Sequence, residues 1–120
     1  MIDVSEYDDL LKKMLKPERY RHSLGAMETA RKLALKWGAD ADRAQIAGLL
    51  HDITKNMPDA EQLEMMKKSG VPLTEEVLAC PFIWHSYTSA YYVRDVLGIN
   101  DGEIFGGIYY HTTGKKGMTL

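Results

Sequence analysis

An all-α fold is predicted for this chain of 120 residues. Apolar residues recur at helical spacing in successive segments, and each segment is bounded by a capping residue, a glycine or a proline. Apolar runs that could form strands, such as Ile108-Tyr109-Tyr110, are too short to decide between helix and strand. The length suits one domain, residues 1–120, whose core can form without disulfide bonds.

Two helices are expected in the first third of the chain. Ser5 can cap a short first helix, which Pro17 then interrupts. Pro17 is tolerated in the first turn of a second helix that runs to Trp37, and Gly38 is its C-terminal stop. One face of this second helix is apolar and the opposite face is charged. The apolar face comprises Leu24, Met27, Ala30, Ala34 and Trp37.

A third helix is expected to lie at the centre of the fold. Asp40 is a good N-cap for it, and it ends in the dipeptide His51-Asp52. After Gln45 the helix is apolar on nearly every side, as is typical of a buried helix. A carboxylate that follows such a run is costly to bury, so Asp52 needs a cation or other compensating partner.

A fourth helix and a short fifth segment follow. Asp59 is the expected N-cap of the fourth helix, with Gln62 at the reciprocal capping-box position, and Gly70 ends it. Thr74 begins the fifth segment, and Pro81 interrupts the chain after it.

Two further helices complete the prediction. The first runs over residues 82–97 and stops at Gly98. Asn100 and Glu103 then form a capping box that opens the last helix, which carries His111.

Composition argues against several classes of function. The formal net charge is −2, and acidic and basic residues are mixed, so there is no basic patch for duplex nucleic acid. No apolar run approaches the ~20 residues that span a bilayer, so no membrane partner is expected. The single cysteine, Cys80, is interpreted as a buried structural thiol rather than a reactive one. One cysteine and no signal peptide together indicate the cytoplasm.

The candidate functional residues are four histidines, each on a different expected helix or at its end. They are His22, His51, His85 and His111. Helix bundles commonly build metal sites from side chains on facing helices. Imidazoles combined with the carboxylate of Asp52 suit iron, manganese or zinc. The alternative is that each histidine is a core residue hydrogen-bonded to backbone, and their spacing in the sequence does not decide between the two.

Lys55 is a candidate for binding phosphate. It follows His51 by four residues, so it shares that face if the helix continues past Asp52. There it could meet a phosphate oxygen bound to the metal. The alternative is a solvated lysine that the helix dipole favours near a C-terminus.

Four segments of the chain carry a further pattern. They are Arg19-Tyr20-Arg21-His22-Ser23-Leu24-Gly25, Ala47-Gly48-Leu49-Leu50-His51-Asp52-Ile53-Thr54-Lys55, Trp84-His85 followed by Ser89-Ala90, and His111-Thr112-Thr113-Gly114. In this order they resemble the motifs of the YqeK family within the HD-domain superfamily, over nearly the whole chain. The resemblance implies an all-helical HD-domain bundle.

The resemblance also implies a function. Members of this family hydrolyse diadenosine tetraphosphate symmetrically to two ADP, using a pair of metal ions. Iron is the first candidate for these ions, with manganese and zinc as alternatives. A metal-activated water would attack one phosphorus, while Lys55 neutralises charge on the phosphoryl oxygens.

Site residues follow from the resemblance. The implied metal ligands are His22, His51, Asp52, His85 and His111. Asp52 would bridge the two ions, and together with Lys55 it is the implied catalytic pair. The implied substrate contacts are Arg19 and Lys55 on phosphate, and Thr112, Thr113 and Gly114 along the substrate cleft.

One departure from the family pattern matters. HD domains complete the first metal shell with a distant aspartate, and this sequence stops at Leu120 before that motif would appear. Asp95 and Asp101 lie between the third and fourth histidine elements, so neither fits. We therefore expect a truncated family member that lacks its C-terminal helices.

Two alternatives to diadenosine tetraphosphate hydrolysis stay open. One is a phosphohydrolase acting on other nucleotides, such as nucleoside mono- or diphosphates. The other is a nucleotide-binding sensor domain that has lost catalysis. A plain helical interaction domain would leave the histidine pattern unexplained. The sequence also leaves the oligomeric state open, a homodimer included.

Overall fold

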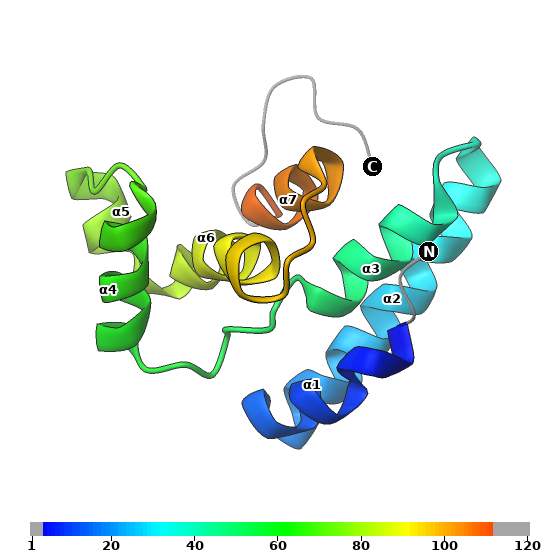
Figure 1. Cartoon of the computed structure of the whole chain (residues 1–120), viewed down its shortest axis with the longest axis horizontal. Helices are drawn as coiled ribbons and strands as arrows, with labels where there is room; N and C mark the ends of the chain where they lie inside the picture. Colours follow the sequence, from blue (N-terminus) through cyan, green and yellow to red (C-terminus); the bar gives the residue numbers. More distant parts are fainter. Residues whose placement is uncertain (1–3, 112–120) are drawn as a thin grey trace.

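A computed structural model describes residues 4–111, which are helical without any strand between those limits (Figure 1). The prediction of an all-α fold is confirmed. In chain order the helices are η1 (Val4–Tyr7), α1 (Asp8–Met14), α2 (Pro17–Trp37), α3 (Ala41–Leu50), α4 (Asp59–Ser69), α5 (Glu75–Ala79), η2 (Pro81–Ile83), α6 (Trp84–Tyr91), η3 (Tyr92–Val96) and α7 (Gly102–Tyr109).

Helices α2 and α3 lie side by side and form the scaffold of the fold (Figure 1). Gly38 ends α2 with a φ of 73°, and Asp40 caps α3 by accepting a hydrogen bond from the Arg43 amide, as predicted. The two backbones approach closely at Gly48, where an added Cβ would lie 2.7 Å from the carbonyl oxygen of Ala26. The absence of a side chain at this position therefore sets the distance between the two helices.

The main core surrounds α3, as predicted. It comprises Leu11, Leu15, Ile46, Leu49, Leu50, Ile53, Ala90, Val93, Ile99, Ile104 and Ile108, which are all buried. Burying one such side chain contributes about 1.5–3 kcal/mol. A second cluster of Met66, Val71, Trp84 and Tyr87 packs α4 against α6. Helix α6 therefore touches both clusters, which fixes its position in the fold.

Several predicted helix starts are wrong. Helix α1 begins at Asp8 and not after Ser5, because residues 4–7 form a 3-10 turn first. Helix α4 has Pro58 as its N-cap, because Pro58 holds the extended backbone before the first turn, and Asp59 is already helical. Helix α7 is capped by Asp101 instead of Asn100, since the Asp101 carboxylate accepts from the amides of the first turn.

The predicted helix over residues 82–97 is broken into three parts. Residues 81–83 form a 3-10 turn, α6 follows, and η3 widens into a π turn in which the Leu97 amide donates to the Tyr92 carbonyl. Gly98 still ends the segment with a φ of 74°. The buried polar residues of α6, namely His85, Ser86, Thr88 and Ser89, lie before this π turn.

Two predicted buried positions are more exposed than expected. Trp37 is 65% exposed, because α2 contacts the main core only through its first half, at Tyr20, Leu24 and Met27. Cys80 is half-buried, because α5, at whose end it lies, has no fully buried residue. No helix within residues 4–111 combines the length and apolarity that crossing a bilayer requires.

Candidate metal centre

Asp52 lies at the centre of the candidate site, buried in the turn that follows α3. Four imidazoles direct their Nε2 atoms at its carboxylate. The distances to Oδ2 are 3.7 Å from His22 and 3.4 Å from His51. The distances to Oδ1 are 3.1 Å from His85 and 3.5 Å from His111. The fold thus brings together, from α2, α3, α6 and the end of α7, the five side chains predicted as ligands.

The five side chains divide into two halves that share Asp52. The Oδ2 half contains His22 and His51, and the Oδ1 half contains His85 and His111. In each half, the three potential ligand atoms lie within 4.8 Å of one another. His22 is 51% exposed, whereas the His85 side chain is 7% exposed. The Oδ2 half therefore opens to solvent at His22, and the Oδ1 half is more deeply buried.

Backbone carbonyls fix the orientation of three of the four imidazoles. Nδ1 of His51 lies 2.7 Å from the Gly48 carbonyl, and Nδ1 of His85 lies 2.8 Å from that of Phe82. Nδ1 of His111 lies 2.6 Å from the carbonyl three residues before it. A carbonyl only accepts, so Nδ1 carries the proton in each case. Each neutral ring therefore presents an Nε2 lone pair to Asp52.

In this arrangement, groups that only accept hydrogen bonds face one another. Lone pairs on Nε2 face a carboxylate, and Nε2 of His85 lies only 3.2 Å from Nε2 of His111. Such contacts are unfavourable unless a cation or a proton lies between the atoms. Neutral imidazole nitrogens and a carboxylate are the donor set that iron, manganese and zinc prefer. The residues present therefore fit a divalent metal.

Ionisation of the centre follows from its burial and its hydrogen bonds. Burial opposes the charged form of Asp52, but hydrogen bonds from His111 and His85 outweigh it and hold the pKa of this carboxyl below its usual range. Because Nδ1 of each ring is committed to a carbonyl, the Nε2 lone pairs beside this carboxylate would be available to a bound metal. Burial also lowers the pKa of His51, which keeps its ring neutral and able to bind metal.

Arg19, predicted to contact phosphate, lies at the centre itself. Its guanidinium donates to Oδ2 of Asp52, and its side chain is 30% exposed. Its Nε atom is buried without a hydrogen-bond partner among residues 4–111. Arg19 therefore supplies the Oδ2 half with a positive charge that the Oδ1 half lacks.

Lys55 reaches its position differently from the prediction. Helix α3 ends at Leu50, and the Lys55 amide donates to the Asp52 carbonyl in a tight turn. The expectation that Lys55 shares a helical face with His51 is wrong, because the helix does not continue past Asp52. The Lys55 side chain is half-buried, and its ammonium makes no ion pair within the described part of the chain. Thr112, Thr113 and Gly114 lie outside the described residues.

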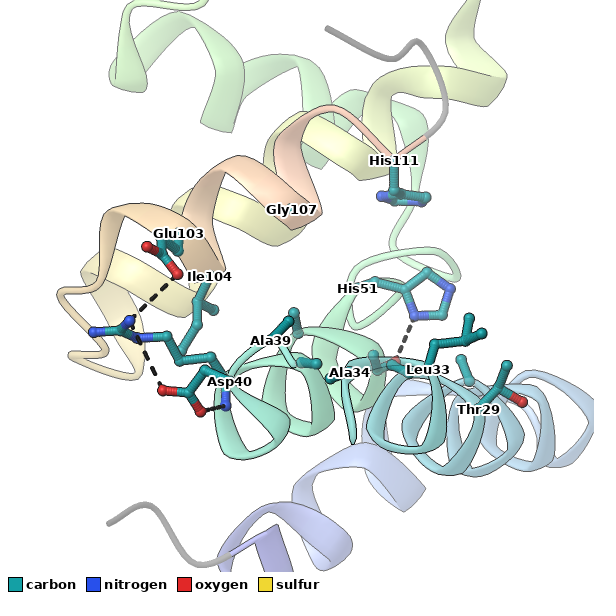
Figure 2. Close-up of a pocket in the computed structure, with 16 residues that line it drawn as sticks. Thr29, Leu33, Ala34, Ala39, Asp40, His51, Glu103, Ile104, Gly107 and His111 are labelled. Carbon is teal, nitrogen blue, oxygen red and sulfur yellow. Dashed lines mark hydrogen bonds and ion pairs between the residues drawn. The ribbon is translucent and has the colours of Figure 1, made fainter. Parts of the chain in front are cut away.

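A groove that sequence reasoning missed leads to the centre between α2, α3 and α7 (Figure 2). Its volume is about 420 Å³. His51 and His111 lie at one end, and Asp40 and Glu103 lie at the other (Figure 2). Small side chains form much of its wall, namely Ala26, Ala30, Ala34, Ala44, Ala47, Gly48 and Gly107. The signal available in the sequence was this repetition of alanine and glycine on helix faces expected to meet.

Comparison with known proteins gives a consistent result. The HD domain family model matches residues 19–119. Symmetrical bis(5'-nucleosyl)-tetraphosphatase from Bacillus subtilis is 37% identical over 92% of this chain and 59% of its own length. The protein of the same name from Staphylococcus aureus is 33% identical over 98% of this chain and 60% of its own length. The chain thus spans about three fifths of the length of these relatives.

A solved structure shows the same fold. The crystal structure of a predicted HD superfamily hydrolase involved in NAD metabolism from Clostridium acetobutylicum superposes with a TM-score of 0.94 at 34% identity. The match covers 100% of this chain and 64% of that protein. These findings confirm the resemblance that the four ordered motifs suggested.

Proposed function

This chain belongs to the HD-domain family, and from that membership we propose that it is the metal-dependent hydrolase domain of a symmetrical dinucleoside tetraphosphatase. The proposed reaction adds one water to diadenosine tetraphosphate at the central phosphoanhydride bond and releases two ADP. The names of several relatives over most of this chain support that substrate. The activity, the substrate and the location in the cytoplasm are proposals for the whole protein.

The observation that carries the proposal is the sharing of one buried carboxylate by two pairs of imidazoles. Asp52 offers Oδ2 to His22 and His51, and Oδ1 to His85 and His111. His22 and His51 with Asp52 would hold one cation, and His85 and His111 with Asp52 would hold a second. We propose that these five side chains hold two divalent ions, with iron as the first candidate and manganese or zinc as alternatives.

The bound ions would supply the nucleophile, because a divalent metal lowers the pKa of water towards neutrality. The protein positions the ligands of these ions. Asp52 faces the imidazoles of both halves, and backbone carbonyls orient three of the four imidazoles. The Oδ1 half is more deeply buried than the Oδ2 half, which strengthens electrostatic interactions there.

Two cations of the chain are proposed to bind phosphate. Arg19 pairs with Asp52, and with metal held at the site its guanidinium would be available to contact substrate oxygens in a bidentate manner. Lys55 has an ammonium without an ion pair within residues 4–111, in the same turn as Asp52. It would neutralise negative charge on the phosphoryl oxygens. We also propose that Thr112, Thr113 and Gly114 line the substrate cleft.

Replacement of His51 by alanine tests the proposal. It removes a ligand at the end of α3 and should abolish bound metal and turnover together. Metal content is measured by elemental analysis of protein purified without added metal, and turnover by separating ADP from the dinucleotide. Lys36→Ala, on the exposed side of α2, is the matched control and should keep both. Full turnover in His51→Ala with unchanged metal content would refute the assignment.

The same assay separates the alternative functions. Two ADP from each dinucleotide indicate symmetric cleavage, whereas turnover only of nucleoside mono- or diphosphates would indicate a different nucleotide substrate. Nucleotide binding without hydrolysis, in the presence of iron or manganese, would indicate a sensor domain. The mass of the protein in solution tests whether it forms a homodimer.

A further inference from the structure

A second group of buried polar side chains lies beside the metal centre, outside the predicted ligands. It consists of Thr54, Gln62, Thr88 and Ser89, which are at most 3% exposed. Buried hydroxyls without partners are destabilising, so such a group persists only when its members satisfy one another. We call these four residues the hydroxyl network.

Thr54 is the central member of the hydroxyl network. Its Oγ1 lies 2.7 Å from Oγ1 of Thr88 and 2.7 Å from Oγ of Ser89. It also lies 3.2 Å from the carbonyl oxygen of His85. The Thr54 amide donates to Oγ of Ser89 over 3.1 Å. One side chain thus connects the turn after α3 to successive turns of α6.

One order of protons makes Thr54 the donor to His85. The Thr54 amide donates to Ser89, whose hydroxyl donates back to Oγ1 of Thr54. Thr88 also donates to Oγ1 of Thr54, and the Thr54 hydroxyl donates to the carbonyl oxygen of His85 over 3.2 Å. Nε2 of Gln62 donates to the Met57 carbonyl over 2.9 Å. Each hydroxyl donates once, so removing Thr54 from the middle would leave partners on both sides unsatisfied.

The hydroxyl network acts on one half of the metal centre only. Thr54 lies two residues after Asp52, and its Oγ1 meets the backbone of His85, whose ring lies 3.1 Å from Oδ1 of Asp52. Backbone and side-chain contacts therefore form a closed loop through these three residues. The Oδ2 half uses His22 and His51 on α2 and α3, which take no part in the network.

We propose that Thr54 is a positioning residue that holds His85 at its distance from Asp52 and so sets the metal affinity of the Oδ1 half. This inference rests on the proposed function, because it assumes that both halves bind metal. Polar groups that orient metal ligands commonly change affinity about 10- to 100-fold when they are removed. Valine is close to threonine in shape but lacks the hydroxyl, so Thr54→Val removes the hydrogen bonds while keeping the volume.

The test separates the two halves with background variants. His22→Ala leaves a complete Oδ1 half, and His111→Ala leaves a complete Oδ2 half. Manganese titration should show that Thr54→Val weakens binding about tenfold in the His22→Ala background. It should leave binding unchanged in the His111→Ala background. Thr54→Ser, which restores the hydroxyl, should bind as the parent does.

A control distinguishes positioning from general loss of stability. Val93→Ala removes buried apolar volume from the main core without removing a member of the hydroxyl network, and it should lower the thermal unfolding temperature without weakening manganese binding in the His22→Ala background. Equal weakening by Val93→Ala and Thr54→Val, or equal weakening of both halves by Thr54→Val, would overturn the positioning role.

Hydrogen exchange of the metal-free protein tests the same role without a metal. Thr54→Val should speed exchange at the Thr54 amide and along α6 more than Val93→Ala does, because the amide loses its ordered acceptor. Unchanged exchange there would overturn the inference. Failure of the parent protein to bind manganese would instead reject the proposed function, while the exchange comparison would still decide the role of Thr54.

Discussion

The two halves of the metal centre share Asp52 but are built differently. The Oδ1 half is the more buried, both of its imidazoles are oriented by backbone carbonyls, and the hydroxyl network contacts His85. The Oδ2 half includes the half-exposed His22, for which the described residues provide no carbonyl acceptor at Nδ1, and it contains the guanidinium of Arg19. The Oδ1 half is thus held in place before metal binds.

The two halves show two ways in which the negative charge of Asp52 can be balanced. In the Oδ2 half a side chain of the protein itself provides the positive charge. In the Oδ1 half the lone pairs of His85 and His111 face each other at 3.2 Å, so a proton or a metal must supply that charge. We therefore expect metal to compete with Arg19 in the Oδ2 half and to relieve the contact between the two Nε2 atoms in the Oδ1 half.

The largest effect is expected from Asp52→Asn, which removes the group that both halves share. The amide keeps the shape of the side chain but cannot bridge two cations. Turnover should fall by about 10³-fold or more, because the charge that organises the site is lost. Metal content should fall in both halves, as measured by elemental analysis. Loss of only one ion would show that the halves do not depend equally on Asp52.

Gly48→Ala should disturb the Oδ2 half in particular. The added Cβ would lie 2.7 Å from the Ala26 carbonyl oxygen and 3.0 Å from Cα of Met27, so α2 has to move away from α3. Overpacking of this kind lowers the free energy of unfolding by about 1–3 kcal/mol, which denaturant titration measures. We expect manganese binding to weaken in the Oδ2 half more than in the Oδ1 half.

Gly25→Ala is the matched control for that variant. Gly25 is also in α2, but a Cβ there would meet no atom within 4 Å. The change should raise the free energy of unfolding by up to about 1 kcal/mol, because alanine favours the helix. A destabilised Gly25→Ala protein would show that the effect of Gly48→Ala does not come from close approach of the helices.

Arg19→Gln should show what the guanidinium contributes before metal binds. It leaves the buried Asp52 without its counter-charge, which should lower the free energy of unfolding of the metal-free protein by about 1–2 kcal/mol. That value is reduced from the ~3–5 kcal/mol of a fully buried pair because Arg19 is 30% exposed. Saturating manganese should remove most of the difference in thermal unfolding. An equal difference with and without metal would contradict competition between Arg19 and metal.

The smallest effect concerns pH. Burial lowers the pKa of His51 below 6.5, so this residue contributes stability above the unfolded pKa and loses it as pH falls through the folded pKa. The metal-free protein should therefore lose stability from pH 7 towards pH 5, by at most about 1.4 kcal/mol per pH unit. His51→Gln should flatten this slope in denaturant titrations. The lowered pKa of Asp52 acts in a lower window, below the ordinary carboxyl range.

Sequence patterns predicted the helices well where a local signal decides the backbone. Gly38, Gly70 and Gly98 end their segments with positive φ, as expected, and Asp40 and Thr74 cap theirs. The error at Asn100 arose because two neighbouring residues could each cap the helix, and the error at Asp59 arose because α4 begins after Pro58 without a side-chain cap. The backbone conformation before the first turn decides between them, and side-chain identity alone does not reveal it.

The candidate ligands were identified in the sequence, but their grouping was not. His22, His51, His85 and His111 were chosen from helical position and family resemblance, and nothing local indicated which pair would face which oxygen of Asp52. The hydroxyl network was missed for a similar reason. Threonine and serine in a helix can bond locally or point to solvent, and only packing of α6 against the turn after α3 buries them together.

The sequence by itself determined the helical fold, the end of α3 at His51-Asp52 and the set of residues able to bind metal, because these depend on local backbone preferences and on residue chemistry. Only the tertiary structure decided that Asp52 divides its two oxygens between two pairs of imidazoles, that Arg19 lies against one of them, and that Thr54 connects to His85. These contacts join residues far apart in the chain. They arise from how close α2, α3, α6 and α7 can pack, a distance that depends on all of their side chains at once.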